Sequence, residues 1–308
     1  MKKIILVALA AVGLAACATE DTIVTPKGNA IAFGDAFVDN ATKAIIADAG
    51  DIQDFTVFGN VNNNVALYGN GAPVTRNGAG NGEAFKCEVV RYWTPSCTFN
   101  FAAVANGTVE ANDVVNGLPT KISYTVDAND PKDLIYATAA ATTDNASVVT
   151  PATGCTVTNG IVGFTFNHLL SKVYFEVTHS LGNDYSIEVT NIAVSGVQLA
   201  GTYNYDNENK TWSWNKDGDT TTTLNFANGA NGAELIIPVN QTLGITITYN
   251  IKFGETTIST GATKTGTIAA RDYAQNTVYK IGAEIGLNKI DFTVTSLNGF
   301  NSPEVNVP

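Results

Sequence analysis

The chain has 308 residues, a net charge of −11 and only 15% charged residues. This length allows two domains of ordinary size, and the low charge with abundant glycine, asparagine and threonine is typical of a turn-rich all-β protein. The negative charge argues against nucleic acid as a partner, because phosphate backbones are bound mainly by lysine and arginine.

The N-terminus has the pattern of an export signal. A basic start at residues 1–3 precedes an apolar stretch at residues 4–12, which is too short to span a membrane. Leu14-Ala15-Ala16-Cys17 then has the form of a lipobox. We expect a signal peptide over residues 1–17, lipid on Cys17 and a surface-exposed position at the cell outer membrane. A plain secretory signal with an accidental cysteine is the alternative.

The first strand is predicted over residues 29–37, where Ile31 and Phe33 share one face. A small, polar segment with Thr42-Lys43-Ala44 follows it at residues 39–50. Further strands are expected at residues 54–60, 85–94, 97–104, 121–126 and 133–138. Cys87 and Cys97 flank a short aromatic segment; they either form a disulfide or remain buried thiols.

The central stretch, residues 161–178, contains two alternating runs joined by a turn. Val162, Phe164 and Phe166 share a face in the first run, and Val173 and Phe175 share a face in the second. We expect this stretch to found a sandwich core and to open a second domain. Its further strands are predicted at residues 186–195, 201–214, 221–226, 234–239, 244–253, 263–269 and 277–285. The expected domains are therefore residues 29–155 and 156–286.

The C-terminal stretch, residues 287–308, is expected to be extra to these domains. Ile290, Phe292 and Val294 alternate with polar residues, as in a strand. Further apolar side chains follow at Leu297, Phe300, Val305 and Val307. Because the second domain has enough strands by Ile285, this segment predicts an unpaired apolar extension.

Catalytic patterns are missing from the sequence. It has no Gly-x-Ser-x-Gly elbow, no phosphate-binding loop and no carboxylate pair that stands out. His168 is interpreted as a hydrogen-bonded packing residue, and the acidic clusters lack EF-hand spacing. We therefore expect no enzyme activity, no metal and no cofactor. Trp212 and Trp214 alternate on a presumed hairpin, which either stacks on sugars or divides between core and surface.

Several motifs together resemble the fimbrillin family, the type V pilins of Gram-negative surface lipoproteins. Besides the lipobox they are Ala30-Ile31-Ala32-Phe33, Ala41-Thr42-Lys43-Ala44, Asp54-Phe55-Thr56-Val57-Phe58-Gly59, Tyr92-Trp93-Thr94-Pro95, Phe99-Asn100-Phe101-Ala102-Ala103, Asp133-Leu134-Ile135-Tyr136-Ala137 and Phe164-Thr165-Phe166-Asn167-His168-Leu169-Leu170-Ser171-Lys172-Val173. The resemblance implies two transthyretin-like β-sandwich domains in tandem. It also implies a lipidated precursor that loses its first strand by proteolysis and then polymerises.

In such a polymer the C-terminal strand of one subunit fills the groove left by the first strand of the next, which is β-strand addition. The resemblance thus assigns subunit contacts to Ile31, Phe33, Ile290, Phe292, Val294, Leu297, Phe300, Val305 and Val307, with residues 287–308 as a donor-strand extension. Cleavage is expected between Lys43 and Ala44, although the family's best-known members have arginine at this position. Cleavage at Lys27, or none, is the alternative.

The implied partners are other fimbrial subunits, the outer membrane through the lipid, and a host or bacterial surface ligand. The implied location after processing is the fimbrium. An uncut chain would be an anchor or tip component. A different possibility is a surface lipoprotein adhesin that binds glycans and never polymerises, with Trp212 and Trp214 as its binding residues.

Overall fold

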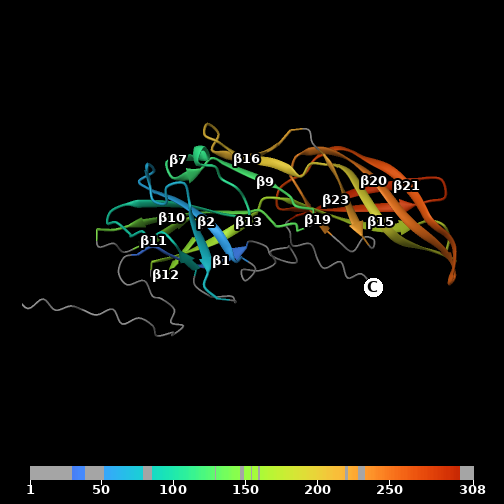
Figure 1. Ribbon diagram of the computed structural model, residues 1–308, viewed down its shortest axis with the longest axis horizontal. Coiled ribbons are helices and arrows are strands. Elements are labelled where there is room, and N and C mark those ends of the chain that lie inside the picture. Colours follow the sequence, from blue (N-terminus) through green and yellow to red (C-terminus); the bar gives the residue numbers. More distant parts are fainter. Residues whose placement is uncertain are drawn as a thin grey trace, which may run out of the picture.

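The protein is almost entirely β-structure. The computed structural model describes residues 30–38, 52–78, 85–128, 130–145, 149–153, 155–158, 160–218, 221–227 and 233–298. Within these residues, a single 3-10 turn at Ala111–Asp113 interrupts a long series of strands, so the all-β prediction is confirmed. The first half of the chain lies at one end of an elongated molecule and the second half at the other (Figure 1). No helix in the described ranges is long and apolar enough to cross a membrane.

The first half forms a large sheet that curls around an aromatic core. Its strands follow the order β11-β10-β6-β2-β4-β5-β1-β13-β12, and β10 also pairs with β13. This extra pairing connects distant parts of the path, so that one face encloses the core. The strands are β1 (Ala32–Val38), β2 (Asp54–Val61), β4 (Ala72–Arg76), β5 (Phe85–Cys87), β6 (Thr98–Ala105), β10 (Ile135–Thr143), β11 (Val149–Thr153), β12 (Cys155–Thr158) and β13 (Ile161–His168), and β3 (Val65–Ala66) pairs with β2.

A smaller sheet covers the opposite face of this large sheet. It consists of β9 (Lys121–Thr125), β16 (Ala200–Asp206) and β17 (Thr211–Lys216). Figure 1 shows β16 beside β9 above the large sheet. Phe58 and Val104 point to this side and pack in one cluster with Ile122 and Tyr203. A hairpin from the second half of the chain therefore completes the packing of the first half. Beside β9, β7 (Val114–Val115) and β8 (Leu118–Pro119) form a two-stranded ribbon.

The second half is a sandwich of two four-stranded sheets with an aliphatic core. One sheet has the order β19-β14-β22-β23 and the other the order β18-β15-β20-β21. Alternate residues of these strands point inward and bury isoleucine, valine and leucine side chains between the sheets. The strands are β14 (Ser171–His179), β15 (Tyr185–Val197), β18 (Thr222–Ala227), β19 (Ala233–Ile236), β20 (Asn240–Phe253), β21 (Thr256–Asp272), β22 (Thr277–Ile285) and β23 (Ile290–Asn298).

The central stretch divides between the two halves. Phe164 and Phe166 of β13 enter the aromatic core, whereas Val173 and Phe175 of β14 enter the aliphatic core. The expected division between residues 155 and 156 is therefore wrong, because β13 is a central strand of the first sheet. The cause is local: an alternating run shows that a strand has a buried face but not which core it faces. The count of two tandem domains stays a prediction.

The C-terminal stretch is not a free extension over its described part. Strand β23 pairs antiparallel with β22 from Ile285↔Ile290 to Val278↔Leu297 and forms the edge of its sheet. Ile290, Phe292 and Val294 pack against the aliphatic core, and the Phe292 ring lies directly over Gly266 of β21. The expectation that the sandwich is complete at Ile285 is wrong, since an edge position remained for β23 to fill.

Candidate functional site

The first strand occupies a groove between β13 and β5. Along β13 it runs parallel, with Phe33 opposite Val162 and Gly34 opposite Gly163, and the register shifts before Phe37. Towards β5 it has a single paired position, Phe33↔Phe85. One side of β1 is thus held by a ladder that is interrupted between Gly34 and Phe37, and the other side by little backbone pairing. Side-chain packing therefore contributes most of the free energy that keeps such a strand bound to the sheet.

Phe33 is the side chain that fixes β1 in this groove. It is only 1% exposed and belongs to the aromatic core. Its ring stacks on Phe164 with centroids 5.8 Å apart, and it meets Phe55 and Phe101 edge to face at 6.3 and 6.2 Å. Full burial of a phenylalanine contributes about 1.5–3 kcal/mol, and each aromatic pair adds roughly 0.5–1.5 kcal/mol. The groove therefore contains a deep slot for an aromatic ring, and Ile31 fills a second, buried position beside it.

The N-terminal end of the groove is closed by residues 91–93, which we call the entrance strap. The Ile31 N–H donates to the Arg91 carbonyl at 2.8 Å, and Ala30 forms an antiparallel bridge with Tyr92. The Trp93 indole N–H donates to the Gly160 carbonyl at 3.1 Å, which ties the strap to the turn before β13. Trp93 is buried while Tyr92 is 60% exposed, so the strap has an inner and an outer face.

The position directly after Phe33 in the groove has room for a small residue only. A Cβ atom added to Gly34 would lie 2.8 Å from the Cγ2 methyl of Ile161, closer than real contacts. The ring of Tyr68 also packs on Phe33, with the ring centroids 6.0 Å apart. Burial at this position raises the pKa of the Tyr68 phenol. A strand that fits this groove without rearrangement thus has a large aliphatic residue, an aromatic residue two positions later, and a small residue directly after the aromatic one.

The two cysteines near the groove are free thiols. Cys87, at the end of β5, donates its S–H to the Val89 carbonyl at 3.3 Å, and Cys97 donates to the Pro95 carbonyl at 3.3 Å. Burial raises the pKa of the Cys87 thiol. The disulfide considered from the sequence is therefore not formed, and the alternative of partly buried thiols describes both residues.

The tail residues expected to contact another subunit are placed in part. Ile290, Phe292, Val294 and Leu297 are half-buried in β23; the first three alternate with exposed residues, and two exposed residues separate Val294 from Leu297. Cys17, Lys43, Ala44, Phe300, Val305 and Val307 lie outside the described residues. The structure therefore brings Ile31 and Phe33 together in one core and Ile290 and Phe292 in another, and it does not join the two sets within one chain.

His168 is fully buried at the end of β13, as expected for a packing residue. Its Nδ1 atom forms a hydrogen bond with a carboxylate oxygen of Asp133, which is also fully buried. The Asp133 carbonyl in turn accepts from the Asn106 amide at 2.8 Å. Burial raises the pKa of Asp133, and the hydrogen bond from His168 opposes that rise. Since neither side chain reaches solvent, the pair can bind no substrate. The sequence analysis missed this partner because the two residues are 35 positions apart.

The tryptophan hairpin is a packing element. Trp212 stacks on the buried Tyr203 with centroids 4.9 Å apart, and it also contacts Tyr136 of β10 at 5.2 Å. The Trp214 indole N–H donates to the Leu169 carbonyl at 2.9 Å. Both rings are half-buried and join the two halves of the molecule. The two rings do not form an open face on which a sugar could stack. The glycan-binding alternative, which rests on these two residues, therefore loses its support.

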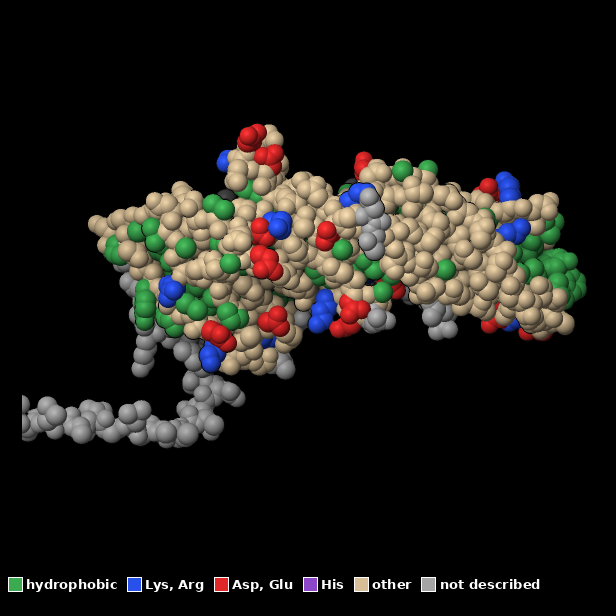
Figure 2. Space-filling view, turned by 45° about the horizontal axis from the view of Figure 1, so that its top comes forward, with side chains coloured by type: hydrophobic (Ala, Val, Ile, Leu, Met, Phe, Trp, Pro, Cys, Tyr) green, Lys and Arg blue, Asp and Glu red, His purple; other side chains and the backbone are tan. Residues whose placement is uncertain are grey.

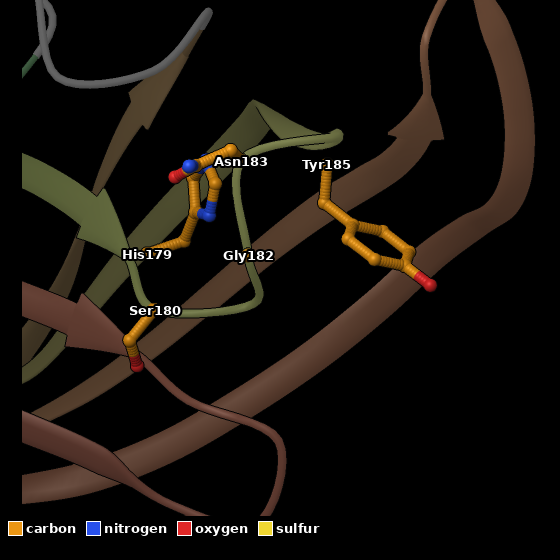
Figure 3. Close-up of a pocket in the computed structure, with 5 residues that line it drawn as sticks. All are labelled: His179, Ser180, Gly182, Asn183 and Tyr185. Carbon is orange, nitrogen blue, oxygen red and sulfur yellow. The ribbon is translucent and has the colours of Figure 1, made fainter.

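A shallow hollow lies at the end of the second-half sandwich that points away from the first half, which we call the far end. It has a volume of about 470 Å³ and is lined by His179, Ser180, Gly182, Asn183 and Tyr185. In Figure 3 the Ser180 hydroxyl and the Tyr185 ring point away from His179 and Asn183. The polar groups therefore do not converge on a common point. Among the described residues, no group of three or more histidine, cysteine, aspartate or glutamate side chains could hold a metal.

Comparison with known proteins identifies the family. The model of the fimbrillin-like family matches residues 39–296. The chain belongs to this fimbrillin-like family. The match begins directly after β1, so it does not itself cover the strand in the groove. A search of curated proteins finds no match to the sequence.

Solved structures share the fold of this fimbrillin-like chain. A candidate cell adhesion protein from Bacteroides uniformis ATCC 8492 has a TM-score of 0.57 and 14% identity, over 87% of this chain and 97% of that one. One from Bacteroides ovatus ATCC 8483 has a TM-score of 0.54 and 13% identity, over 89% and 98%. A fimbrial protein from Bacteroides vulgatus ATCC 8482 has a TM-score of 0.50 and 16% identity, over 86% and 99%. At these identities the likeness concerns the fold alone.

Proposed function

We propose that this protein is a structural fimbrial subunit with a role in cell adhesion, located in fimbriae at the cell surface. It polymerises when β1 is removed by cleavage between Lys43 and Ala44 and β23 of a neighbour takes its place. Membership of the fimbrillin-like family supports the fimbrial role. Similar folds in proteins described as fimbrial or as candidates for cell adhesion support it further.

The observation that carries the exchange mechanism is a repeated pattern in β1 and β23. The groove binds Ile31-Ala32-Phe33, with isoleucine and phenylalanine buried and the residue between them facing outward. Strand β23 begins with Ile290-Asp291-Phe292, which has the same spacing and the same two side chains. Placed in the groove with Phe292 at the position of Phe33, β23 keeps Asp291 on the outer face and puts Thr293 at the position of Gly34, so the Ile161 side chain must move to admit it.

The difference in burial between the edge of the donor's own sandwich and the acceptor groove favours the exchange. Phe292 is only half-buried at the edge of its own sandwich, whereas the slot of Phe33 excludes nearly all solvent. Burying the rest of the ring adds free energy at about 25 cal/mol per Å² of apolar surface. Ile290 gains in the same way. Because donor and acceptor positions are different surfaces of the same chain, the contact is head-to-tail and extends into an open filament.

Polymerisation after processing tests this function. The protein is treated with trypsin, the new N-terminus is sequenced, and polymers are measured by sedimentation and electron microscopy. Wild-type chains that start at Ala44 should form filaments, and Phe292→Asp should prevent them because a carboxylate cannot enter the slot. Val65→Asp is the matched control, since it places a carboxylate on β3 at a side chain that is 60% exposed. Wild-type chains that start at Ala44, have released β1 and stay monomeric would refute the proposal.

A second function follows if β1 is never removed. In the structure β1 is paired along β13 and its aromatic slot is filled. An uncut chain, held to the outer membrane by lipid on Cys17, would act as the anchor or tip of a fimbria, or as an adhesin that does not polymerise. The N-terminus of the mature surface protein distinguishes these roles: Ala44 indicates a stalk subunit, and a lipidated Cys17 indicates an anchored one.

A further inference from the structure

We propose a second contact between successive copies, in which Leu287 at the far end of one copy packs on Tyr92 of the entrance strap of the next. This inference rests on the proposed strand exchange. It assigns an interface outside the groove, and its occupant is a second copy of this chain.

The far end of the second sandwich exposes apolar side chains. Leu287 is 79% exposed in the turn between β22 and β23, and Phe253 and Ile258 are 50% and 55% exposed at the β20–β21 hairpin. Tyr185 pairs with Phe253 at the same end, with ring centroids 5.3 Å apart. Figure 2 shows hydrophobic side chains gathered at this tip of the molecule. Exposed apolar groups that cluster in this way mark interaction surfaces more often than scattered ones do.

The entrance strap lies towards the opposite end of the molecule. It borders the beginning of β13, where Ala32 pairs with Ile161, whereas the far end borders the end of β14, where His179 pairs with Ile285. Strands β13 and β14 follow one another from the first half to the second (Figure 1). The strap exposes Tyr92 on its outer face, and Val90, which directly precedes the strap, is also exposed. Each copy thus carries one apolar surface at each end, as a head-to-tail contact requires.

The register of the proposed exchange brings these two surfaces together. With Ile290 at the position of Ile31, Lys289 takes the place of Ala30 and lies opposite Tyr92. When residues 287–289 extend in line with β23, Leu287, two residues earlier, projects from the same face, because side chains alternate along a strand. Tyr92 is exposed and Trp93 buried, so this shared face is the outer one. Diagonal neighbours in an antiparallel pair are about 7–8 Å apart, within reach of an aromatic ring.

The short connection to the donor sandwich makes the contact unavoidable. Four residues separate Ile285, the last residue of β22, from Ile290, so five Cα–Cα steps join the two. Even fully extended they span only about 17 Å at roughly 3.4 Å per residue. The far end of the donor must therefore lie against the entrance strap of the acceptor.

Charge substitutions in the trypsin-processed full chain test the contact. Tyr92→Glu and Leu287→Glu should each lower the rate of polymerisation about tenfold, and together they should lower it further through repulsion. Combining Tyr92→Lys with Leu287→Glu should restore most of the loss. Val65→Glu is the control, because Val65 is also 60% exposed but lies on β3.

A peptide separates this contact from the groove itself. An acetylated peptide of residues 290–308 lacks Leu287, so it should bind processed wild-type and Tyr92→Glu chains equally well. Polymerisation of all variants at the wild-type rate would overturn the end contact and leave the strand exchange standing. Wild-type chains that have lost β1, stay monomeric and fail to bind the peptide would overturn the proposed function, and the end contact with it.

Discussion

The ring of Phe33 in β1 stacks on the ring of Phe164 in β13, with centroids 5.8 Å apart and planes 16° from parallel. Phe33 lies at the start of the described chain and Phe164 near its middle, so this contact ties the first strand to the core of the sheet. It is also the contact that a replacing strand must reproduce. The predictions below concern this groove and the packing that shapes it.

Phe33→Ala should lower the free energy of unfolding of the uncut protein by about 3–5 kcal/mol, because it empties a slot lined by aromatic rings. Urea unfolding measures the loss. Val65→Ala, at an exposed site, should change stability by less than about 0.5 kcal/mol. A cost for Phe33→Ala below about 1 kcal/mol would show that β1 is held mainly by backbone pairing.

Gly34→Ala should destabilise β1 by about 1–3 kcal/mol, because its Cβ would meet the Cγ2 methyl of Ile161 at 2.8 Å. Ile161→Ala removes that methyl. In a double-mutant cycle the combined cost should therefore be smaller than the sum of the two single costs. Additive costs would mean that the neighbouring residues yield without strain.

His168→Ala should lower stability by about 3–5 kcal/mol, since it leaves the Asp133 carboxyl group buried without its partner. Calorimetry or urea unfolding measures this change. His179→Ala is the matched control, because His179 is only half-buried and should cost less than about 1 kcal/mol. Similar losses for both histidines would argue against a special role for the Asp133–His168 pair.

Trp214→Phe should cost about 1–3 kcal/mol, because it keeps an aromatic ring but removes the indole donor from the Leu169 carbonyl. It should leave binding to a glycan array unchanged, as the ring packs within the molecule. Loss of a specific glycan signal with unchanged stability would favour the adhesin alternative instead.

The sequence predicts the strands well where one face is buried. Ile31 and Phe33, and likewise Phe164 and Phe166, alternate with more exposed residues as a period of two requires. The family motifs also direct attention to residues 92–95, which the structure places at the entrance of the groove. These features depend on residues that are close together in sequence, so the sequence pattern is enough to predict them.

Pairings between distant strands were not predictable in the same way. Nothing in the alternation of β16 shows that it pairs with β9 from the first half of the chain. The same holds for β23, whose apolar face fits an edge of its own sandwich as well as a groove elsewhere. The burial of Asp133 was likewise not predictable, because its partner His168 is far away in sequence. The alternation shows that a strand has a buried face, but it does not show which strand or core packs against that face.

The most direct test of the account measures the affinity of the tail for the emptied groove. Isothermal titration of chains without β1 against the peptide of residues 290–308 compares three versions of that peptide. Phe292→Ala should weaken binding about 100-fold, corresponding to about 2.8 kcal/mol, while Val305→Ala with Val307→Ala should weaken it less than about tenfold. Unchanged binding of Phe292→Ala, or a greater loss from the two valines, would contradict the claim that Phe292 takes the place of Phe33.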